Sequence, residues 1–199
     1  MPPRWSRPIR VETVAGAALK PLLSELARLR IELFREFPYL FDGEVEFERT
    51  YLSRFADTPG AAVIVVRDGT SLVGAATCQP LAAEQAGIQK PFADAGMDVS
   101  RIFYFGEAVL KKPYRGRGIG VTSFKAREAL AGGYGTTAFY AVDRPDDHPR
   151  RTKDYVPLCD FWRHRGYHPR PELACTLSWR EVGDDAETRK KLIIWTKVL

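Results

Sequence analysis

The stretch that most constrains the fold runs from Arg101 to Val142, where apolar, glycine-rich, helix-forming and again apolar segments follow one another. The patterns "RIFYFGEAVL" (101–110) and "TTAFYAVD" (136–143) predict strands, and residues 118–131 predict a helix that ends before two glycines. A strand, loop, helix and strand in this order make a right-handed crossover between parallel strands. The glycine-rich loop therefore lies at the carboxyl end of a strand, where α/β folds commonly bind ligands.

The loop itself reads "RGRGIG" (115–120), with Gly116, Gly118 and Gly120 at alternate positions. Glycine suits a backbone that bends sharply or approaches another group closely. The first N–H groups of the following helix have no intrahelical partner and carry partial positive charge, so they favour an anion such as phosphate. A solvated glycine-rich turn is the alternative that this loop alone leaves open.

The residues before this unit predict two helices and a hairpin. Residues 9–14 suggest a short strand, and leucines at helical spacing over 19–33 predict an amphipathic helix, followed by a second helix at Val45–Phe55. Two β-branched runs flank Asp68-Gly69, which predicts an antiparallel pair. The irregular segment 81–99 predicts a partly helical connection, and connections of this length are often lids or substrate loops.

The last part of the chain predicts a helix over 157–164 and two closing strands at 171–179 and 191–199. Strands and helices in this order belong to an α+β, or mixed α/β, fold with a mixed sheet. No repeat, low-complexity tract or linker interrupts the chain, so we expect residues 1–199 to form a single domain.

Composition and charge limit the classes of binding partner and the cell compartment that we expect for this protein. The net charge of +5 favours an anionic partner, but the charges are mixed along the chain and no zinc-finger spacing is present, so nucleic acid is not indicated. No apolar stretch approaches the roughly 20 residues that span a bilayer, and "MPPRWSRPIR" lacks the apolar centre of a signal peptide. We therefore expect no membrane partner and a cytoplasmic location.

The three cysteines, Cys78, Cys159 and Cys175, are widely spaced and include no C-x-x-C pair. Neither a disulfide framework nor a metal site is indicated by this spacing. We expect them to be buried reduced thiols.

Two motifs carry a resemblance to a known family. Residues 115–120 look like the R/Q-x-x-G-x-G/A signature of the GNAT superfamily, the acyl-CoA-dependent N-acyltransferases, and they likewise follow a strand and open a helix. The segment "CDFWRHRGYHP" is similar to that family's closing helix motif, with Phe161-Trp162 and Gly166-Tyr167 as its two pairs. The order of elements agrees over nearly the whole chain.

The resemblance implies a central, mostly antiparallel mixed sheet of about seven strands flanked by helices. Acetyl-CoA would bind as cosubstrate, without a metal, in the cleft between the two central parallel strands. Its pyrophosphate would contact the loop residues Arg115, Gly116, Arg117, Gly118, Ile119 and Gly120, and its pantetheine arm would run along Ala108, Val109 and Leu110.

The resemblance also implies direct transfer of the acetyl group from acetyl-CoA to an amine. Glu107 lies where many family members place a base, and it is the only acid on the strand from Arg101 to Leu110. Burial near apolar Phe105 and Val109 would raise the pKa of Glu107 toward the working pH. The alternative is that Glu107 pairs with a basic residue and has a structural role.

The general acid departs from the family pattern. Trp162 stands where many relatives carry a tyrosine, and an indole N–H is not a useful proton donor. Tyr155 lies seven residues earlier, on the same helix face if the helix reaches back that far, and could supply the phenol. A thiol with a pKa near 8.5 also leaves without a dedicated acid. Trp162 then belongs to the core or to a wall of the cofactor slot.

Other charged groups invite weaker readings. Lys125 and Arg127 could reach the adenosine 3′-phosphate, although charges on an exposed helix face are usually only solvated. His148 lies in a loop of mixed charge and His164 at the basic end of a helix, and both favour structural or solvent-exposed roles.

The acceptor would be a small-molecule or peptide amine. By resemblance its pocket would lie between the loop "FPYLFDGEVE" (37–46) and the region near Trp179 and Trp195. The aromatic and acidic side chains of this loop could enclose a cationic amine, or the loop could simply dock onto the core. Two alternative functions stay open, a catalytically silent acyl-CoA-binding or sensor protein and an unrelated phosphate-binding module. A homodimer also stays open as the oligomeric state.

Overall fold

The computed structural model describes residues 8–199. Its sheet consists of seven strands: β1 (Arg10–Ala15), β2 (Ala62–Asp68), β3 (Ser71–Pro80), β4 (Ile102–Leu110), β5 (Thr136–Val142), β6 (His168–Arg180) and β7 (Glu187–Val198). The helices of the described part are α1 (Leu23–Phe34), α2 (Val45–Asp57), α3 (Ala86–Asp94), α4 (Ile119–Leu130) and α5 (Cys159–His164). Shorter 3₁₀ turns precede α1, flank α3 and follow β4.

The strands are arranged in the order β1-β2-β3-β4-β5-β7-β6. Among the strands of the described residues, only β4 and β5 pair in parallel, and every other neighbouring pair is antiparallel. The predicted mixed, mostly antiparallel sheet is therefore confirmed. A parallel pair needs a crossover connection, and α4 with its loop supplies it.

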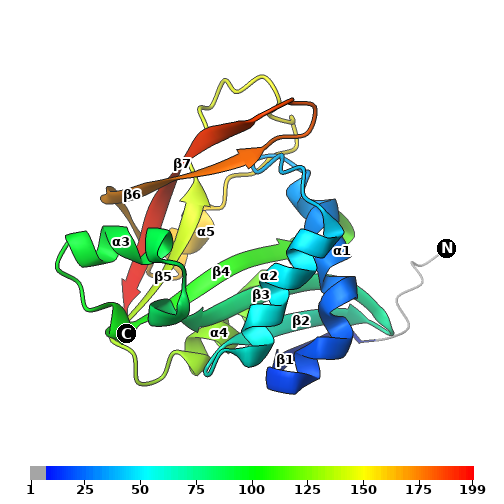
Figure 1. Cartoon of the computed structure of the whole chain (residues 1–199). Coiled ribbons are helices and arrows are strands. Elements are labelled where there is room, and N and C mark those ends of the chain that lie inside the picture. The colour runs from blue at the N-terminus through cyan, green and yellow to red at the C-terminus, as the bar shows by residue number, and fades with distance from the viewer. Residues whose placement is uncertain (1–7) are drawn as a thin grey trace.

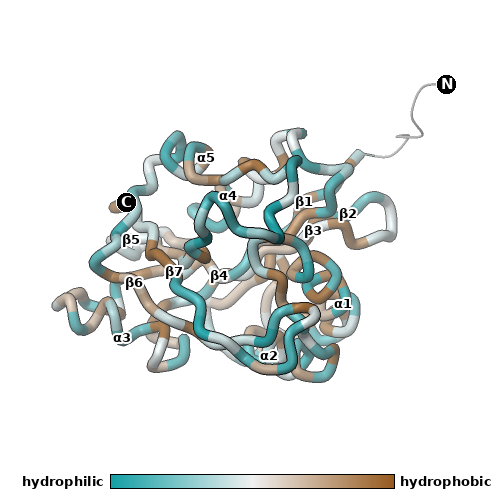
Figure 2. The backbone as a smooth tube through the Cα atoms, turned by 90° about the horizontal axis from the view of Figure 1, so that it is seen from above, coloured by the Kyte–Doolittle hydropathy of each residue, from teal (hydrophilic) through white to brown (hydrophobic). Residues whose placement is uncertain are grey.

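The helices cover both faces of this sheet. Figure 1 shows α1 and α2 side by side across the strands β2 to β4. Seen from above, α1, α2 and α3 lie on one side of the strands, and α4 and α5 lie on the other (Figure 2). The apolar core accordingly has separate clusters, one between α1, α2 and the first strands, and one between α4, α5 and the central strands.

Most predicted elements are present, with shifted ends. Pro21 lies in a 3₁₀ turn over Gly16–Leu22, so the leucine-rich helix begins only at Leu23. The hairpin turn is Gly69-Thr70, because Asp68 still pairs with Ser71. Segment 81–99 is partly helical, as expected, and carries α3.

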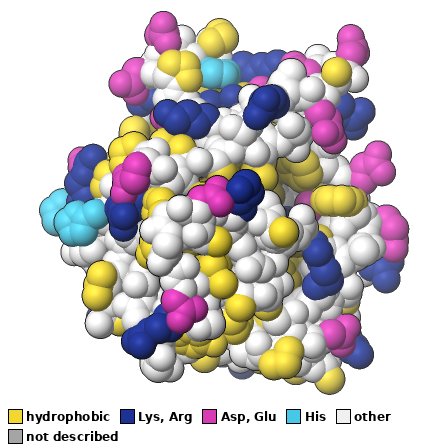
Figure 3. Space-filling model, turned by 60° about the vertical axis from the view of Figure 1, so that its left-hand side comes forward, with side chains coloured by type: hydrophobic (Ala, Val, Ile, Leu, Met, Phe, Trp, Pro, Cys, Tyr) yellow, Lys and Arg dark blue, Asp and Glu magenta, His cyan; other side chains and the backbone are white. Residues whose placement is uncertain are grey.

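Charged side chains of both signs are interspersed on the face shown in Figure 3. None of the helices within residues 8–199 combines the length and apolar character that a membrane crossing requires. The start of the chain that bears on a signal peptide, residues 1–7, lies outside the described part. Cys78, Cys159 and Cys175 are free thiols, and Cys78 is buried while the other two are half-buried.

Candidate active site

The two central strands part from each other soon after they pair. β4 and β5 are in register only over Ile102–Tyr104 and Thr136–Ala138, although β4 continues to Leu110 and β5 to Val142. Beyond Tyr104, β4 pairs only with β3 among the described strands. Backbone N–H and C=O groups on its β5 side are thus available to a ligand.

The residues expected to hold the pantetheine arm lie along this opening. Ala108, Val109 and Leu110 pair with β3 on their other side, opposite Ala76, Ala75 and Gly74. Ala108 is exposed, whereas Val109 packs beneath α1 and α2. The sequence-based expectation for this stretch therefore fits the strand geometry, and it remains a prediction.

The glycine-rich loop ends in an uncapped helix N-terminus. Gly116 and Gly118 have φ values of 71° and 78°, a left-handed conformation that favours glycine. Gly118 is the N-cap of α4, and no side chain from the described part of the chain caps this helix. The first intrahelical bond runs from Thr122 N to Gly118 O (3.1 Å), so the amides of Ile119 and Gly120 precede it. This end of α4 can accept an anion.

The glycine at position 120 is explained differently from Gly116 and Gly118. Gly120 does not have a positive φ, and among the described residues a Cβ built there would contact only the Phe161 ring, at 3.8 Å. The protein backbone therefore tolerates a side chain at this position. A ligand that approaches the first turn of α4 closely would explain glycine at Gly120 better than the fold does.

The arginines of the loop are already engaged. Arg115 Nε donates to the carbonyl of Leu110 at 2.8 Å, and Arg115 Nη2 forms an ion pair with Glu36 at 2.9 Å. The Arg117 guanidinium lies 5.7 Å from the Tyr114 ring centroid. Arg115 thus ties the loop to the end of α1, a role that sequence reasoning did not foresee.

Arg127 is not on an exposed helix face, which corrects the expectation that it could reach a phosphate. It is 2% exposed, and its guanidinium lies 4.5 Å from the ring centroids of both Phe105 and Phe124. Burial lowers the pKa of Arg127 to about 10. Lys125 is exposed, as expected.

A β-bulge in β4 sets the direction of Glu107. Ala76 pairs with Ala108 and Cys78 with Phe105, so Gly106 and Glu107 together face Thr77. Because alternation along a strand has a period of two, the extra residue moves Glu107 from the face of Phe105 to the face of α1 and α2. A Cβ at Gly106 would overlap Thr77 Oγ1, so the bulge requires glycine here.

Four donors surround the Glu107 carboxylate. Oε1 accepts from Arg30 Nη2 (3.2 Å) and from the Tyr51 hydroxyl (3.1 Å), and Oε2 accepts from Arg30 Nη1 (2.8 Å) and Thr77 Oγ1 (2.9 Å). A carboxylate offers about four acceptor positions, so those of Glu107 are filled. Arg30, 5% exposed, also donates to Glu48 at 2.5 Å.

These contacts overturn the expected rise in the pKa of Glu107. Burial does favour the neutral acid, but the charge of Arg30 and the hydrogen bonds from Arg30 and Thr77 outweigh it and hold the pKa below its ordinary value. The structure thus has the pairing with a basic residue that was the alternative interpretation. The assignment of Glu107 as a base remains a prediction.

Tyr155 does not lie on the closing helix, so its spacing of seven residues from Trp162 does not place it on the same helix face, contrary to what was expected. It belongs to the loop before α5, where its N–H donates to Thr152 O at 3.1 Å, and its ring meets Phe37 edge-on at 4.7 Å. Burial raises the pKa of Tyr155, and the nearby Cys159 adds to this effect while Arg151 opposes it. Its hydroxyl therefore stays protonated at neutral pH.

The closing helix packs as core. The Trp162 ring lies 5.1 Å from Phe139 and 5.0 Å from Trp195, which agrees with the core interpretation. Trp195 is 4% exposed and lies in the cluster beneath α4 and α5, so it does not belong to an acceptor pocket beside the loop 37–46. His164 is exposed, and its Nδ1 lies 2.7 Å from the carbonyl of Asp160.

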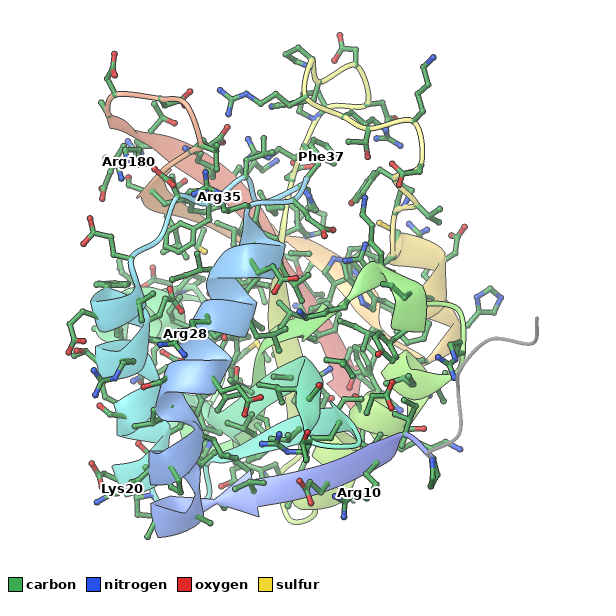
Figure 4. The ribbon with its side chains drawn as sticks, turned by 90° about the vertical axis from the view of Figure 1, so that its right-hand side faces the viewer. Arg10, Lys20, Arg28, Arg35, Phe37 and Arg180 are labelled. Atoms are coloured by element: carbon green, nitrogen blue, oxygen red, sulfur yellow. The ribbon has the colours of Figure 1, made fainter. Side chains whose placement is uncertain are left out.

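The loop between α1 and α2 docks on the β6–β7 hairpin. The indole of Trp179 donates to Tyr39 O at 3.0 Å, and Val182 N donates to Leu40 O at 2.8 Å. Arg35 and Arg180 lie beside each other at this junction (Figure 4), and both pair with Asp42, at 2.5 and 3.0 Å. The carboxylate of Asp42 is thus paired with two arginines of the protein itself, as the docking interpretation implies.

Sequence reasoning missed several residues on the α1 and α2 face. Arg30 and Tyr51 lie far from Glu107 in the chain, and no local pattern connects them. Glu84 lies just after β3 in the connection whose role was left open. Within residues 8–199, no group of three or more His, Cys, Asp and Glu side chains is arranged to hold a metal ion.

Comparison with known proteins supports the fold. No family model matches the sequence, and no curated protein matches it significantly. An acetyltransferase of the GNAT family from Streptococcus pneumoniae superposes with a TM-score of 0.60 at 11% identity, over 96% of this chain and 100% of that one. An acetyltransferase from Thermus thermophilus gives 0.57 at 13% identity, covering 96% and 97% of the two chains.

NAA60 from Arabidopsis thaliana, in complex with a bisubstrate analogue, also gives a TM-score of 0.57 at 12% identity, over 96% of this chain and 99% of that one. These identities are low, and what the likeness establishes is the fold. The chain has the GNAT fold that its two motifs predicted.

Proposed function

We propose that this protein is an N-acetyltransferase that transfers the acetyl group of acetyl-CoA directly to an amine. The observation that carries the proposal is the parting of β4 and β5 next to the uncapped N-terminus of α4. A thioester in the opening would lie beside free strand amides, while a pyrophosphate would meet the helix amides. The GNAT fold of acetyltransferases with solved structures supports the same function.

The residues of the chain fit the cosubstrate at the phosphate end. A Cβ at Gly116 or Gly118 would meet no atom of residues 8–199 within 4 Å, so that part of the chain leaves the space beside the loop open. The amides of Ile119 and Gly120 would bind the pyrophosphate, together with those of the loop residues Gly116, Arg117 and Gly118. Arg115 would hold the loop against α1 rather than contact the phosphate.

The reaction needs an amine that has lost a proton and a thiolate that gains one. An amide N–H of β4 between Ala108 and Leu110 would stabilise the negative charge that develops on the thioester oxygen. The Tyr155 hydroxyl is the candidate donor to the leaving thiolate. Glu107 was the candidate base, yet its four donors favour a second role as the anchor that fixes Arg30, Tyr51 and β4.

The same occupied carboxylate favours one other function, a GNAT-fold protein that binds acyl-CoA without turnover and serves as a sensor. Thermal-shift measurements with CoA, acetyl-CoA, ATP and NAD test the binding step. We expect the melting temperature to rise with CoA and acetyl-CoA alone, since a ligand at 100 times its Kd stabilises by about 2.7 kcal/mol.

Release of free thiol from acetyl-CoA in the presence of primary amines tests the transfer step. Amine-dependent release supports the enzyme. Binding of acetyl-CoA without release from any amine supports the sensor, and a rise with ATP or NAD but not with CoA would contradict both.

A further inference from the structure

A second carboxylate lies on the same face of the sheet as Glu107. Glu84 lines a surface pocket of about 250 Å³ between the C-terminal half of α2 and the residues after β3. The pocket is lined mainly by α2, with the aromatic side chains Tyr51 and Phe55, and it is completed by Gln79 and Ala83. Neither of the sequence motifs includes any of these residues.

This pocket adjoins the point where the central strands part. Gln79 on β3 is in register with Tyr104 on β4, and Tyr104 pairs with Ala138, the last β5 residue in register with β4. The pocket residue Tyr51 donates its hydroxyl to Glu107 at 3.1 Å. The pocket therefore lies next to Glu107, the residue before Ala108, and next to the point at which β4 and β5 part.

The Glu84 carboxylate has room for another partner. Its Oε1 accepts from Gln79 Nε2 at 2.7 Å, and its Oε2 accepts from Gln85 N at 3.1 Å. Each oxygen has a second acceptor position, whereas both oxygens of Glu107 accept two donors each. Of the two carboxylates, Glu84 is the one that can bind an incoming N–H group.

The surroundings also favour proton uptake by Glu84. Burial raises its pKa, and the charge of Glu107 on β4 raises it further. Gln79 and the N–H of Gln85 donate to the carboxylate and oppose the rise, as does the charge of Arg54 on α2. The charge of Glu84 also acts on the phenols of Tyr51, Tyr104 and Tyr140, which lie on α2, β4 and β5, and all three stay protonated because burial raises the pKa of each.

Two neighbouring carboxylates whose environments drive their pKa values in opposite directions commonly divide acid and base roles. We propose that Glu84 binds the ammonium group of the acceptor in this pocket and takes a proton from it, so that a primary alkylamine is the acceptor class. This inference rests on the proposed acetyltransferase function. Tyr51 and Phe55 would contact the alkyl chain, and Arg54 would lie at the rim.

The protons balance in this scheme. The ammonium transfers one proton to a Glu84 oxygen, and the neutral nitrogen attacks the thioester carbonyl. The C–N bond forms and the C–S bond breaks, the thiolate leaves, and the second N–H proton passes to the thiolate, with Tyr155 as the candidate relay. Glu84 then releases its proton to solvent, so the products are the amide, the thiol and one proton.

Carboxyl ¹³C NMR of glutamate-labelled protein tests the binding part without turnover. The Glu84 signal is identified by its loss in Glu84→Gln, and n-butylamine and spermidine are titrated in the presence of CoA. We expect a saturable shift of the Glu84 signal and a smaller shift of the Glu107 signal. If neither amine shifts the Glu84 signal, the pocket is not the amine site and the proposal is overturned.

Steady-state kinetics with the same amines tests the proton role. Glu84→Gln should lower kcat/KM for the amine by roughly 10² to 10⁴, the usual contribution of a positioned base. It should also remove the acidic limb of the pH profile, while affinity for acetyl-CoA stays within about twofold of wild type. The control is Asp94→Asn, an exposed carboxylate on α3 outside the pocket, which should change neither quantity.

The two proposals fail in different ways. If the wild-type protein does not bind acetyl-CoA, the acetyltransferase function is contradicted, regardless of the results with Glu84→Gln. Normal acetyl-CoA binding and turnover in Glu84→Gln, with an unchanged pH profile, would overturn the Glu84 proposal and leave the function standing. If Glu107→Gln instead loses the acidic limb at full folded stability, Glu107 is the base.

Discussion

At the scale of single residues, the clearest feature is Arg30, a buried guanidinium between the carboxylates of Glu48 and Glu107. Its position explains why the pKa of Glu107 is lowered. Arg30 and Glu107 are 77 residues apart, and nothing in the pattern of leucines around Arg30 indicates that it points at a strand. The sequence located the carboxylate, therefore, but could not predict its partner.

This pair predicts a stability difference between two glutamine substitutions. Glu107→Gln should destabilise the protein by about 1 to 3 kcal/mol, because charge-assisted bonds are lost while Glu48 still compensates Arg30. A carboxyl group whose pKa is lowered in the folded protein stabilises the fold above its unfolded pKa. This contribution should therefore decrease as the pH falls below about 4.5 toward the folded-state pKa. Urea unfolding of wild type and variant at pH 7 and pH 3.5 measures it.

Glu84→Gln is the matched comparison in the same experiment. The raised folded-state pKa of Glu84 makes its charge unfavourable, so this variant should lose less stability than Glu107→Gln at pH 7. If Glu107→Gln is as stable as wild type at both pH values, the ion pair contributes nothing and the anchor role is wrong.

At the scale of elements, the β4 bulge is the feature on which the site depends. Gly106→Ala should destabilise by about 1 to 3 kcal/mol, because the new methyl group overlaps Thr77 Oγ1. Adding Thr77→Ala should recover part of that loss even though Thr77 also donates to Glu107. Thermal unfolding of the single and double variants tests this, and strictly additive losses would contradict it.

The elements show which signals in a sequence are sufficient. The leucine stripe, the Asp-Gly hairpin and the glycine loop each have a local pattern, and α1, the β2–β3 pair and α4 follow it. The bulge has no such pattern, because Gly106 is one glycine in an apolar strand and its cause is the Thr77 side chain on the neighbouring strand. Likewise α5 begins at Cys159, so Tyr155 lies outside the helix. A spacing of seven residues between Tyr155 and Trp162 therefore does not put the two side chains on one helix face.

Strand order was also beyond the sequence. β7 lies between β5 and β6, and the hairpin of β6 and β7 brings Trp179 to the loop after α1. The register between distant strands depends on packing across the whole sheet, and a local sequence pattern contains little information about that packing. The contacts between the loop after α1 and this hairpin join distant segments of the chain, and consequently the sequence could not predict them.

At the scale of the whole molecule, the question is whether the two sides of the sheet fold together. The parallel pairing of β4 and β5 spans three residue pairs. Other bridges join the halves: Asp42 N donates to Arg180 O at 3.0 Å, and the buried ring of Phe139 on β5 packs against Phe124 of α4. We therefore predict one cooperative unfolding transition, as the single-domain expectation for residues 1–199 requires.

Two probes can test this cooperativity because they report on different halves. Trp162, Trp179 and Trp195 lie in α5, β6 and β7, and the fourth tryptophan, Trp5, lies outside the described residues. In a Trp5→Phe background tryptophan fluorescence therefore follows the side of α5, β6 and β7, while far-UV circular dichroism is dominated by helices such as α1 and α2 elsewhere. The two urea transitions should coincide. Separate midpoints would mean that the halves unfold independently.

The proposed function requires acetyl-CoA to bind with its pyrophosphate at the first turn of α4, and calorimetric titration of CoA into Gly120→Ala tests this most directly. Within residues 8–199 the new Cβ meets only Phe161, at an ordinary 3.8 Å, so the variant should fold at least as stably as wild type, as should the control Gly132→Ala at the far end of α4. We predict that CoA affinity falls at least about tenfold in Gly120→Ala, a loss of about 1.4 kcal/mol, and stays at the wild-type value in Gly132→Ala. Equal CoA affinity in wild type and Gly120→Ala would contradict the phosphate site and with it the proposed function.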